Sequence, residues 1–243
     1  MNVQHRYGLV GQTLKHSFSE RYFKKKFLNE NIENAIYQNY EMDDLSEIFV
    51  LAEEGIAGLN VTIPYKEKII PLLDELRGGA LVIQAVNTIK VEKGRLIGYN
   101  TDTYGFRESI RPLIHKKIRS NALILGTGGA SKAVEHVLQE FGYSVRFASR
   151  AAGDIRYNEL GKDYISECPV IVNTTPLGMY PNNHQKPDIP YDGIGQDHLL
   201  VDLVYNPEKT LFLEQGESRG ATILNGYRML ELQAEHSWEI WNT

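Results

Sequence analysis

The chain has 243 residues, of which 42% are hydrophobic and 23% are charged, a balance typical of a globular protein long enough for two domains. The net charge of −5, with no long basic block, argues against a nucleic-acid partner. No apolar run reaches the roughly 20 residues that a membrane span needs.

The single cysteine, Cys168, excludes an internal disulfide and a thiolate metal cluster. The histidine spacing offers no His-x-x-x-His pair, so we expect no metal site. The polar N-terminus argues against a secretion signal. We expect a cytoplasmic protein, a monomer or a homodimer, that acts on a small molecule and binds neither nucleic acid nor membrane.

The first 101 residues alternate between strand and helix patterns and predict an α/β domain. The expected strands span Arg6–Val10, Ala35–Tyr40 and Ile56–Ile63, followed by a hairpin of Ala85–Val91 and Arg95–Tyr99. The expected helices are one capped by Ser19 that runs to Asn31, one capped by Asp43 or Asp44 that ends at Gly55, and a short one over Lys66–Leu76.

A helix over Thr103–Leu113 should lead into a second domain in which strands and helices again alternate. The expected elements are strands at Asn121–Leu125, Ser144–Ala148, Val170–Asn173, Leu199–Asp202 and Thr222–Leu224, with a helix over Ala130–Phe141. The segment Gly178–Gln196 is rich in Pro, Asn, Asp and Gly and predicts a mobile, lid-like loop. The amphipathic segment Gly226–Trp241 should form a helix that returns to the first domain and lines the cleft between the two.

The segment Leu123–Ala133 combines the end of a strand, a glycine-rich turn and the start of a helix. Gly126, Gly128 and Gly129 allow a pyrophosphate to approach the main chain, and the N–H groups of the following helix favour its negative charge. Ser131 stands where dinucleotide-binding turns often carry a third glycine. The pattern predicts a Rossmann-like cofactor site, with a tight turn that binds no ligand as the alternative.

The end of the next strand selects the cofactor. NAD enzymes have a carboxylate there that binds the ribose 2′-hydroxyl, whereas this chain has Ser149 and Arg150, with no carboxylate before Asp154. A guanidinium and a hydroxyl suit a 2′-phosphate. We therefore expect NADP, the alternative being that Arg150 is an ordinary surface residue.

Polar side chains gather where the predicted strands of the first domain end, which is where ligands bind in open α/β sheets. These residues are Ser17, Ser19, Asn60, Thr62, Lys66, Asn87, Thr88, Asn100, Thr101 and Asp102. Each one alone could be a cap, a turn residue or a surface residue. Together they indicate a site for a small polyhydroxylated molecule.

Six short motifs follow one another along the chain. They are Asn60–Lys66 (NVTIPYK), Ala85–Thr88 (AVNT), Asn100–Asp102 (NTD), Gly126–Ser131 (GTGGAS), Asn173–Gly178 (NTTPLG) and Asp202–Pro207 (DLVYNP). In this order they resemble the motifs of the shikimate dehydrogenases, and the similarity to this family covers the chain from Gly8 to Trp241. The resemblance implies reversible oxidation of shikimate to 3-dehydroshikimate with NADP in aromatic amino-acid biosynthesis.

The resemblance also implies an α/β fold of two domains with a cleft between them. A three-layer substrate domain would comprise residues 1–101 with 226–243, and a Rossmann-like NADP domain would comprise residues 102–225.

Individual residues receive roles from the same resemblance. Lys66 corresponds to the catalytic lysine, with Asp102 as its catalytic partner. Substrate binding is implied for Ser17, Ser19, Thr62, Asn87, Asp102, Tyr205 and Gln233, the two serines at the substrate carboxylate. Cofactor binding is implied for Gly126, Gly128, Gly129, Ala130, Ser131, Ser149, Arg150, Thr174, Thr175, Pro176, Met179 and Gly226.

The chain departs from the family pattern at a few positions. Glu20, Phe23 and Lys24 replace a proline and a His-Asn pair that usually follow the second serine. Thr103 replaces a glycine, and Ser149 replaces an asparagine. These changes affect the surroundings of the substrate carboxylate and the adenine end of the cofactor.

Oxidation of a secondary alcohol removes a hydride, which the nicotinamide accepts, and a proton, which the protein must accept. Lys66 can take this proton as a general base, while Asp102 fixes the position of its amine. The alternative for these two residues is a structural ion pair.

Three other functions fit parts of the sequence. One is a dehydrogenase that also oxidises quinate, with NAD or NADP. Another is a dehydrogenase of the same two-domain plan that acts on a folate, which leaves Ser17 and Ser19 without a purpose. The third is a non-catalytic NADP-binding protein, which would need neither Lys66 nor Asp102.

Overall fold

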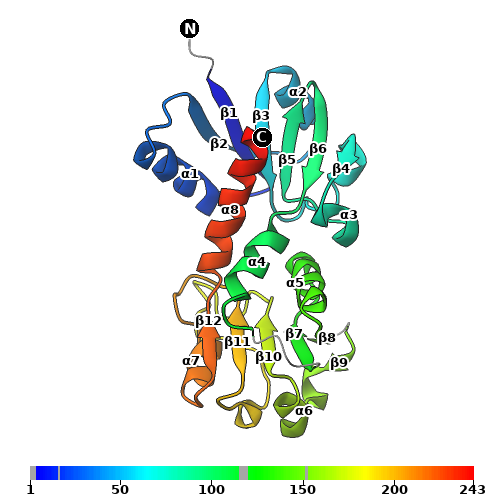
Figure 1. Cartoon of the computed structure of the whole chain (residues 1–243), viewed down its shortest axis with the longest axis vertical. Coiled ribbons are helices and arrows are strands. Elements are labelled where there is room, and N and C mark those ends of the chain that lie inside the picture. The colour runs from blue at the N-terminus through cyan, green and yellow to red at the C-terminus, as the bar shows by residue number, and fades with distance from the viewer. Residues whose placement is uncertain (1–3, 16, 115–119, 151–152) are drawn as a thin grey trace. The chain divides into compact units, whose positions relative to one another are not determined.

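The computed structural model describes residues 4–15, 17–114, 120–150 and 153–243, and the chain forms two compact units (Figure 1). The first unit comprises Met1–Thr101 and Ala234–Thr243, and the second comprises Asp102–Gln233. One boundary therefore falls between residues 101 and 102. The second boundary falls inside the last helix, between residues 233 and 234, whereas the sequence predicted it at residue 226.

The first unit is built on a mixed sheet with the strand order β2-β1-β3-β5-β6-β4. Its strands are β1 (His5–Gly11), β2 (Ala35–Glu41), β3 (Ile56–Val61), β4 (Glu75–Leu76), β5 (Thr88–Glu92) and β6 (Arg95–Tyr99). β1 pairs in parallel with β2 and β3, whereas β5 and β6 form the expected hairpin, antiparallel to β3. Alternate residues of β1 face opposite sides, so Tyr7 and Leu9 pack into one apolar cluster and Val10 packs into another.

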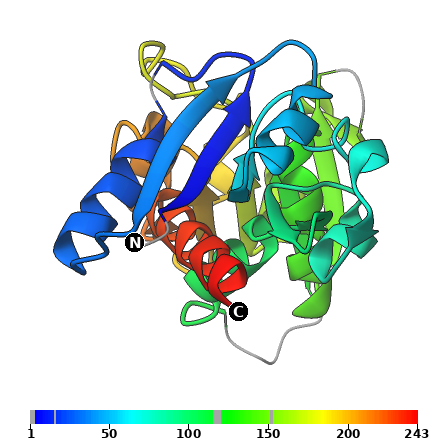
Figure 2. The same cartoon turned by 90° about the horizontal axis from the view of Figure 1, so that it is seen from above.

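Helices cover both faces of this sheet. They are α1 (Phe18–Asn29), α2 (Glu47–Glu53), α3 (Gly79–Ile83) and the last turns of α8 (Tyr227–Asn242). α1 and α8 lie side by side (Figures 1 and 2), and Phe23 and Trp241 are buried together with Tyr7. Ile48 of α2 packs into the cluster on the opposite face. Residues 234–243, the end of the segment that was predicted to return to the first domain, group with the first unit.

The start of α1 differs from the prediction. Its cap is Ser17, whose Oγ accepts a hydrogen bond from the Glu20 N–H at 3.2 Å. Ser19 lies inside the first turn, so the prediction that Ser19 caps this helix is wrong. The earlier start adds Phe18 to the helix, where its ring stacks on Tyr22.

The predicted helix over Lys66–Leu76 is wrong. The segment forms turns, a single turn of 3-10 helix at Ile70–Leu72, and then β4, which pairs with β6. Pro71 has no N–H to continue a helix. Ile69 is fully buried, so the apolar residues of this segment anchor a loop to the core.

The second unit is a parallel sheet with the strand order β12-β11-β10-β7-β8-β9. Its elements are α4 (Asp102–Ile110), β7 (Asn121–Leu125), α5 (Gly129–Glu140), β8 (Ser144–Ser149), β9 (Ile155–Arg156), α6 (Lys162–Ser166), β10 (Val170–Asn173), β11 (Leu199–Asp202), α7 (Leu211–Glu217) and β12 (Thr222–Leu224). α4 and α5 pack on one face and α6 and α7 on the other. The predicted α/β fold, with a Rossmann-like second domain, is confirmed.

The order of strands reverses at β7. From β7 the chain proceeds to β8 on one side, and later to β10 on the other side. In open α/β sheets, ligands bind at the carboxyl ends of the strands at such a reversal. The fold therefore directs attention to the ends of β7, β8 and β10.

The segment Gly178–Gln196 is only partly a loop of the kind expected. Ile189, Tyr191 and Ile194 are buried in the core of the second unit. The prediction of a mobile lid is therefore wrong for the part of the segment that contains them. Residues 179–186 are exposed. Among the described parts of the chain, no helix has both the length and the apolar composition that a membrane crossing requires.

Candidate cofactor and substrate sites

The glycine-rich turn joins β7 to α5 and leaves the main chain bare. Gly126 has a φ of +100°, and a Cβ there would lie 2.7 Å from Cγ2 of Thr175, so only glycine fits. Gly128 caps α5, and no described atom lies within 4 Å of the Cβ that Gly128 or Gly129 would carry. Because the first N–H groups of a helix have no partner within it, an anion can approach this end of α5 closely.

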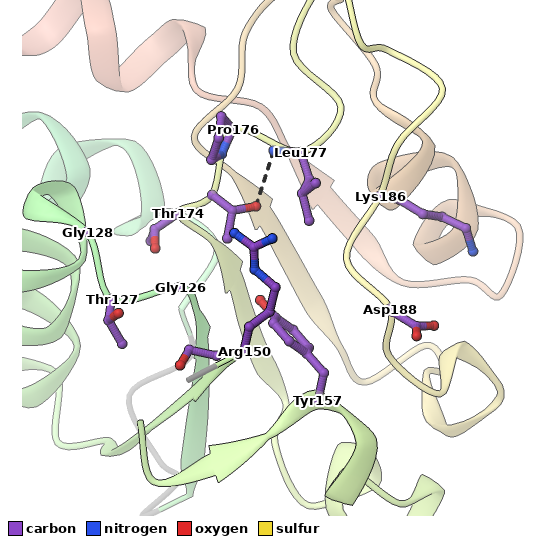
Figure 3. A pocket seen from close by; sticks show the side chains of 12 residues that line it. Gly126, Thr127, Gly128, Arg150, Tyr157, Thr174, Pro176, Leu177, Lys186 and Asp188 are labelled. Atoms are coloured by element: carbon purple, nitrogen blue, oxygen red, sulfur yellow. Dashed lines mark hydrogen bonds between the residues drawn. The ribbon is translucent and has the colours of Figure 1, made fainter. Parts of the chain in front are cut away.

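A pocket of about 600 Å³ opens beside this turn (Figure 3). It is lined by Gly126, Thr127, Gly128, Ser149, Arg150, Tyr157, Thr174, Thr175, Pro176, Leu177, Lys186 and Asp188. These residues come from the ends of β7, β8, β9 and β10 and from the exposed part of the following segment. The volume lies in the range of cofactor pockets, and the bare glycines leave room for a pyrophosphate.

Most of the residues expected to bind the cofactor meet in this pocket. They are Gly126, Gly128, Ser149, Arg150, Thr174, Thr175 and Pro176. Gly129, Ala130 and Ser131 form the first turn of α5, where Ser131 Oγ donates to the carbonyl of Gly128 at 2.6 Å.

Like Gly129, Ala130 and Ser131, the expected cofactor residues Met179 and Gly226 lie outside the lining of this pocket. Met179 is an exposed residue of the turn that follows it. Gly226 packs so closely against Leu203 that a side chain would overlap the Leu203 carbonyl oxygen. Close packing just before α8 therefore requires a glycine at position 226, independently of any contact with the cofactor.

Sequence reasoning missed several residues of the pocket. They are Thr127, Tyr157, Leu177, Lys186 and Asp188. Thr127 and Leu177 lie inside recognised motifs and could have been inferred from them. Tyr157 follows β9, a strand too short to recognise in the sequence. Lys186 lies in the predicted lid, with its Nζ 4.0 Å from the centre of the Tyr191 ring.

Arg150 follows the last residue of β8 and is the cation nearest to the glycine-rich turn in Figure 3. It forms no ion pair with a carboxylate of the described residues. Asp154, the next carboxylate along the chain, accepts a hydrogen bond from the Phe147 N–H at 2.9 Å and so braces β8. A guanidinium that lines the pocket favours an anionic group on the ligand.

A buried chain of hydrogen bonds holds the wall that follows β10. Thr175 Oγ1 donates to Asn173 Oδ1 at 2.6 Å, and Asn173 Nδ2 donates to Asp202 Oδ1 at 2.9 Å. Asp202 also accepts from the Val204 N–H at 3.0 Å and from the Thr210 hydroxyl at 2.5 Å. Burial raises the pKa of Asp202 to about 6, although these donors act in the opposite direction. Asp202 thus fixes Asn173, and Asn173 fixes Thr175.

In the first unit, polar side chains form a buried network. The Tyr37 hydroxyl donates to Asn60 Oδ1 at 2.8 Å, and Asn60 Nδ2 donates to Ser237 Oγ at 3.0 Å and to the Asn87 carbonyl at 3.2 Å. Asn87 Oδ1 accepts from the Thr101 N–H at 2.7 Å. Burial raises the pKa of Tyr37 well above its usual value, so its hydroxyl stays protonated and donates. The network joins β2, β3, the hairpin and α8.

Two of the expected substrate residues lie in or beside this network. Asn87 is connected to Tyr37 through Asn60, and Ser19 lies near enough to the Tyr37 hydroxyl to oppose the rise of its pKa. Ser17 stands two residues before Ser19, at the cap of α1. Sequence reasoning did not include Tyr37 or Ser237, since a lone tyrosine in a strand and a lone serine in a helix carry no motif.

The remaining substrate residues of the first unit follow β3. Thr62 and Lys66 are half-buried there. The Thr62 N–H donates to the Val10 carbonyl at 3.0 Å, and the Lys66 carbonyl accepts from the Val86 N–H at 2.7 Å. Their backbone is therefore held by the sheet and by the segment ahead of the hairpin.

Three expected residues lie in the second unit. Asp102 is the first residue of α4 and is 9% exposed. Gln233 is 8% exposed, and its Nε2 donates to the Leu230 carbonyl at 2.9 Å. Tyr205 is half-buried and follows β11.

The described residues contain no group of three or more His, Cys, Asp or Glu side chains that could hold a metal ion. Cys168 is buried, and burial raises the pKa of its thiol to about 11. The thiol therefore stays protonated and inert at neutral pH.

Comparison with known proteins identifies relatives over almost the whole chain. A profile of the shikimate dehydrogenase substrate binding domain matches residues 9–89. The shikimate dehydrogenase (NADP(+)) of Carboxydothermus hydrogenoformans is 37% identical over 255 aligned positions, which cover 96% of this chain and 90% of the relative.

Solved structures agree with this relationship. A crystal structure of a shikimate dehydrogenase in complex with NADP+ has a TM-score of 0.88 at 31% identity, with 98% of this chain and 90% of that chain covered. The quinate dehydrogenase of Corynebacterium glutamicum in complex with NAD has a TM-score of 0.88 at 26% identity, with 99% and 94% covered. With its parallel sheet, its glycine-rich turn and relatives of more than 30% identity along its length, the chain belongs to the shikimate dehydrogenase family.

Proposed function

We propose that this protein catalyses the reversible, NADP-dependent oxidation of shikimate to 3-dehydroshikimate, a step of aromatic amino-acid biosynthesis. The observation that carries the proposal is a pocket with bare glycines and with Arg150, in a chain 37% identical to an NADP-dependent shikimate dehydrogenase. No carboxylate among the described residues forms an ion pair with Arg150. Residues 102–225 are proposed to bind NADP, and residues 1–101 with 226–243 are proposed to bind shikimate.

The pocket residues suit the parts of NADP. The open main chain at Gly128 and Gly129 can receive the pyrophosphate at the N-terminus of α5. Arg150 can bind the 2′-phosphate, and Thr174 and Thr175 line the pocket where the main chain leaves β10. When bound, NADP supplies the hydride acceptor of the reaction.

The residues of the chain must bind the substrate and handle its proton. Lys66 is proposed to accept the alcohol proton during oxidation and to return it during reduction, with Asp102 as its catalytic partner. Ser17 and Ser19 are proposed to bind the substrate carboxylate. The residues proposed to bind the ring hydroxyls are Thr62, Asn87, Asp102 and Gln233. Tyr205 is proposed to bind the substrate near the nicotinamide.

The test is the loss of NADPH absorbance on addition of 3-dehydroshikimate, measured for the wild type and for Lys66→Ala. Removal of the amine should lower kcat by roughly 10²- to 10⁴-fold, the usual contribution of a general acid or base. The affinity for NADPH should change little, because Lys66 belongs to the first unit and the cofactor pocket to the second.

The matched control is Lys68→Ala, which removes an exposed amine from the same segment and should retain wild-type turnover. A Lys66→Ala enzyme that keeps most of its turnover would remove Lys66 from the mechanism. Absence of any NADPH oxidation by the wild type would refute the proposed reaction.

A second candidate is a dehydrogenase that also oxidises quinate with NAD or NADP. The likeness to the quinate dehydrogenase of Corynebacterium glutamicum favours including it. Steady-state kinetics with shikimate and with quinate, each measured with NAD and with NADP, separate the two functions. The cytoplasmic location and the state of association, a monomer or a homodimer, stay predictions.

A further inference from the structure

Tyr157 brings an unpaired hydroxyl to the cofactor pocket. It is the first residue of the 3-10 turn Tyr157–Glu159 and lines the pocket, while its ring packs against the core of the second unit. The hydroxyl oxygen is buried, and no described residue offers it a hydrogen bond. Since an unpaired buried polar group costs free energy, an acceptor on a bound ligand would be favoured at this position.

The pairing of two strands sets this hydroxyl beside Arg150. β8 and β9 are parallel, with Ser149 opposite Arg156. Arg150 and Tyr157 are the next residues on each chain segment, so they leave the same edge of the sheet at neighbouring positions. In Figure 3 the hydroxyl end of the Tyr157 ring points toward the Arg150 side chain.

The charge state of Tyr157 makes it a donor. Burial raises the pKa of its hydroxyl, and the nearby positive charge of Arg150 lowers it by a smaller amount. The hydroxyl therefore stays protonated at neutral pH. A donor next to a guanidinium is suited to an anion with several oxygens, because the guanidinium takes two oxygens and leaves another for the hydroxyl.

The difference between NADP and NAD is such an anion. NADP carries a phosphate monoester at the ribose 2′-position, with nearly two negative charges at neutral pH, where NAD carries a hydroxyl. Resting on the proposed function, we infer that the Tyr157 hydroxyl donates a hydrogen bond to the 2′-phosphate held by Arg150. Tyr157 is then a second determinant of the preference for NADP over NAD.

The experiment compares the wild type with Tyr157→Phe, which keeps the ring and removes only the hydroxyl. Calorimetry with 2′,5′-ADP and with 5′-AMP as probes measures the contribution of the 2′-phosphate alone. We expect Tyr157→Phe to weaken 2′,5′-ADP binding by about tenfold, a usual effect for a hydrogen bond to a charged group, and to leave 5′-AMP binding unchanged.

Steady-state kinetics should show the same pattern. The KM for NADPH should rise while kcat and the KM for NADH stay near the wild-type values. The midpoint of thermal unfolding without ligand should stay the same or rise, because the variant loses an unpaired buried hydroxyl. A merely structural role for Tyr157 would instead lower this midpoint.

The matched control is Tyr164→Phe, which removes a hydroxyl from a ring against the same core but outside the pocket. It should bind both probes as the wild type does. An equal loss for both probes with Tyr157→Phe, or no loss for either, would overturn the inference. If the wild type binds 2′,5′-ADP no more tightly than 5′-AMP, the proposed use of NADP is itself refuted. This comparison uses the wild type alone, so it is separate from the test of Tyr157.

Discussion

Asp202 is a carboxylate that stabilises the cofactor pocket from inside the protein. It is fully buried at the end of β11 and accepts hydrogen bonds from Asn173, Val204 and Thr210. Burial nevertheless raises its pKa to about 6, above the value of about 3.9 expected in the unfolded chain. The folded protein therefore holds the proton of Asp202 at a pH where the unfolded chain has released it.

This raised pKa predicts a pH dependence of stability that Asp202→Asn should remove. Below about pH 4 the carboxyl is protonated in both states, and its contribution to stability is complete. As the pH rises to about 6, the free energy of unfolding of the wild type should fall relative to the variant by up to about 3 kcal/mol.

Urea unfolding of both proteins at several pH values between about 4 and 7 measures this difference. The Asn side chain can still accept from Asn173 and Val204 and can donate to the Thr210 hydroxyl. A difference in unfolding free energy that stays constant over this range would show that Asp202 titrates as it does in the unfolded chain.

Local sequence patterns reveal some of the site residues and not others. The three glycines and Arg150 could be predicted because a turn, a helix start and a strand end lie within one short segment. Tyr157 could not, because it meets Arg150 only through the pairing of β9, which has two residues. Lys186 and Asp188 were hidden for a similar reason, since only the folded chain brings their segment back to the turn.

At the scale of elements, Ser237 contributes hydrogen bonds that join α8 to the sheet of the first unit. Ser237 is fully buried, and its Oγ lies 3.0 Å from Asn60 Nδ2 and 2.8 Å from Thr88 Oγ1. Ser237→Ala should lower the free energy of unfolding by about 1–3 kcal/mol, because buried donors lose an acceptor. Chemical denaturation measures the change.

Ser166→Ala is the control for this prediction, since Ser166 is an exposed residue at the end of α6. Its effect should stay within about 0.5 kcal/mol. Equal stabilities for Ser237→Ala and the wild type would mean that water or a rearranged Thr88 replaces the lost contact.

Elements with strong local patterns could be predicted, and elements defined by long-range pairing could not. The strands Val170–Asn173, Leu199–Asp202 and Thr222–Leu224 were predicted with the bounds that the structure has. Each is a short apolar run in a parallel sheet, where both faces are covered. Glu75–Leu76 was assigned to a helix because nothing near it in sequence shows its partner β6. Short helices such as α6 and α7 have too few turns for a periodic pattern.

At the scale of the whole molecule, the two units should respond to different ligands. Hydrogen exchange with NADP alone should slow amides of the second unit, around Gly126–Ser131 and Asn173–Gly178. Shikimate alone should slow amides of the first unit, around Ser17, Asn60 and Asn87. The reason is that a ligand reduces local opening of the segments it contacts.

The two protection maps test the division of labour between the units. Protection by shikimate confined to the second unit would contradict the proposed substrate domain. Protection by NADP at the polar network of the first unit, with none at the glycine-rich turn, would contradict the proposed cofactor domain.

The first unit combines residues 1–101 with residues 234–243, and these two parts of the chain leave the ribosome at different times. Trp241 stacks on Tyr7 at 4.9 Å between ring centres, and its indole N–H donates to the Ile89 carbonyl at 2.9 Å. A ribosome reaches Trp241 only after it has translated all of residues 102–233. The half of the protein that emerges first is therefore the half that must wait longest for its last core residue. The nascent chain can complete the parallel sheet of the second unit before Trp241 is available to pack against Tyr7 of the mixed sheet.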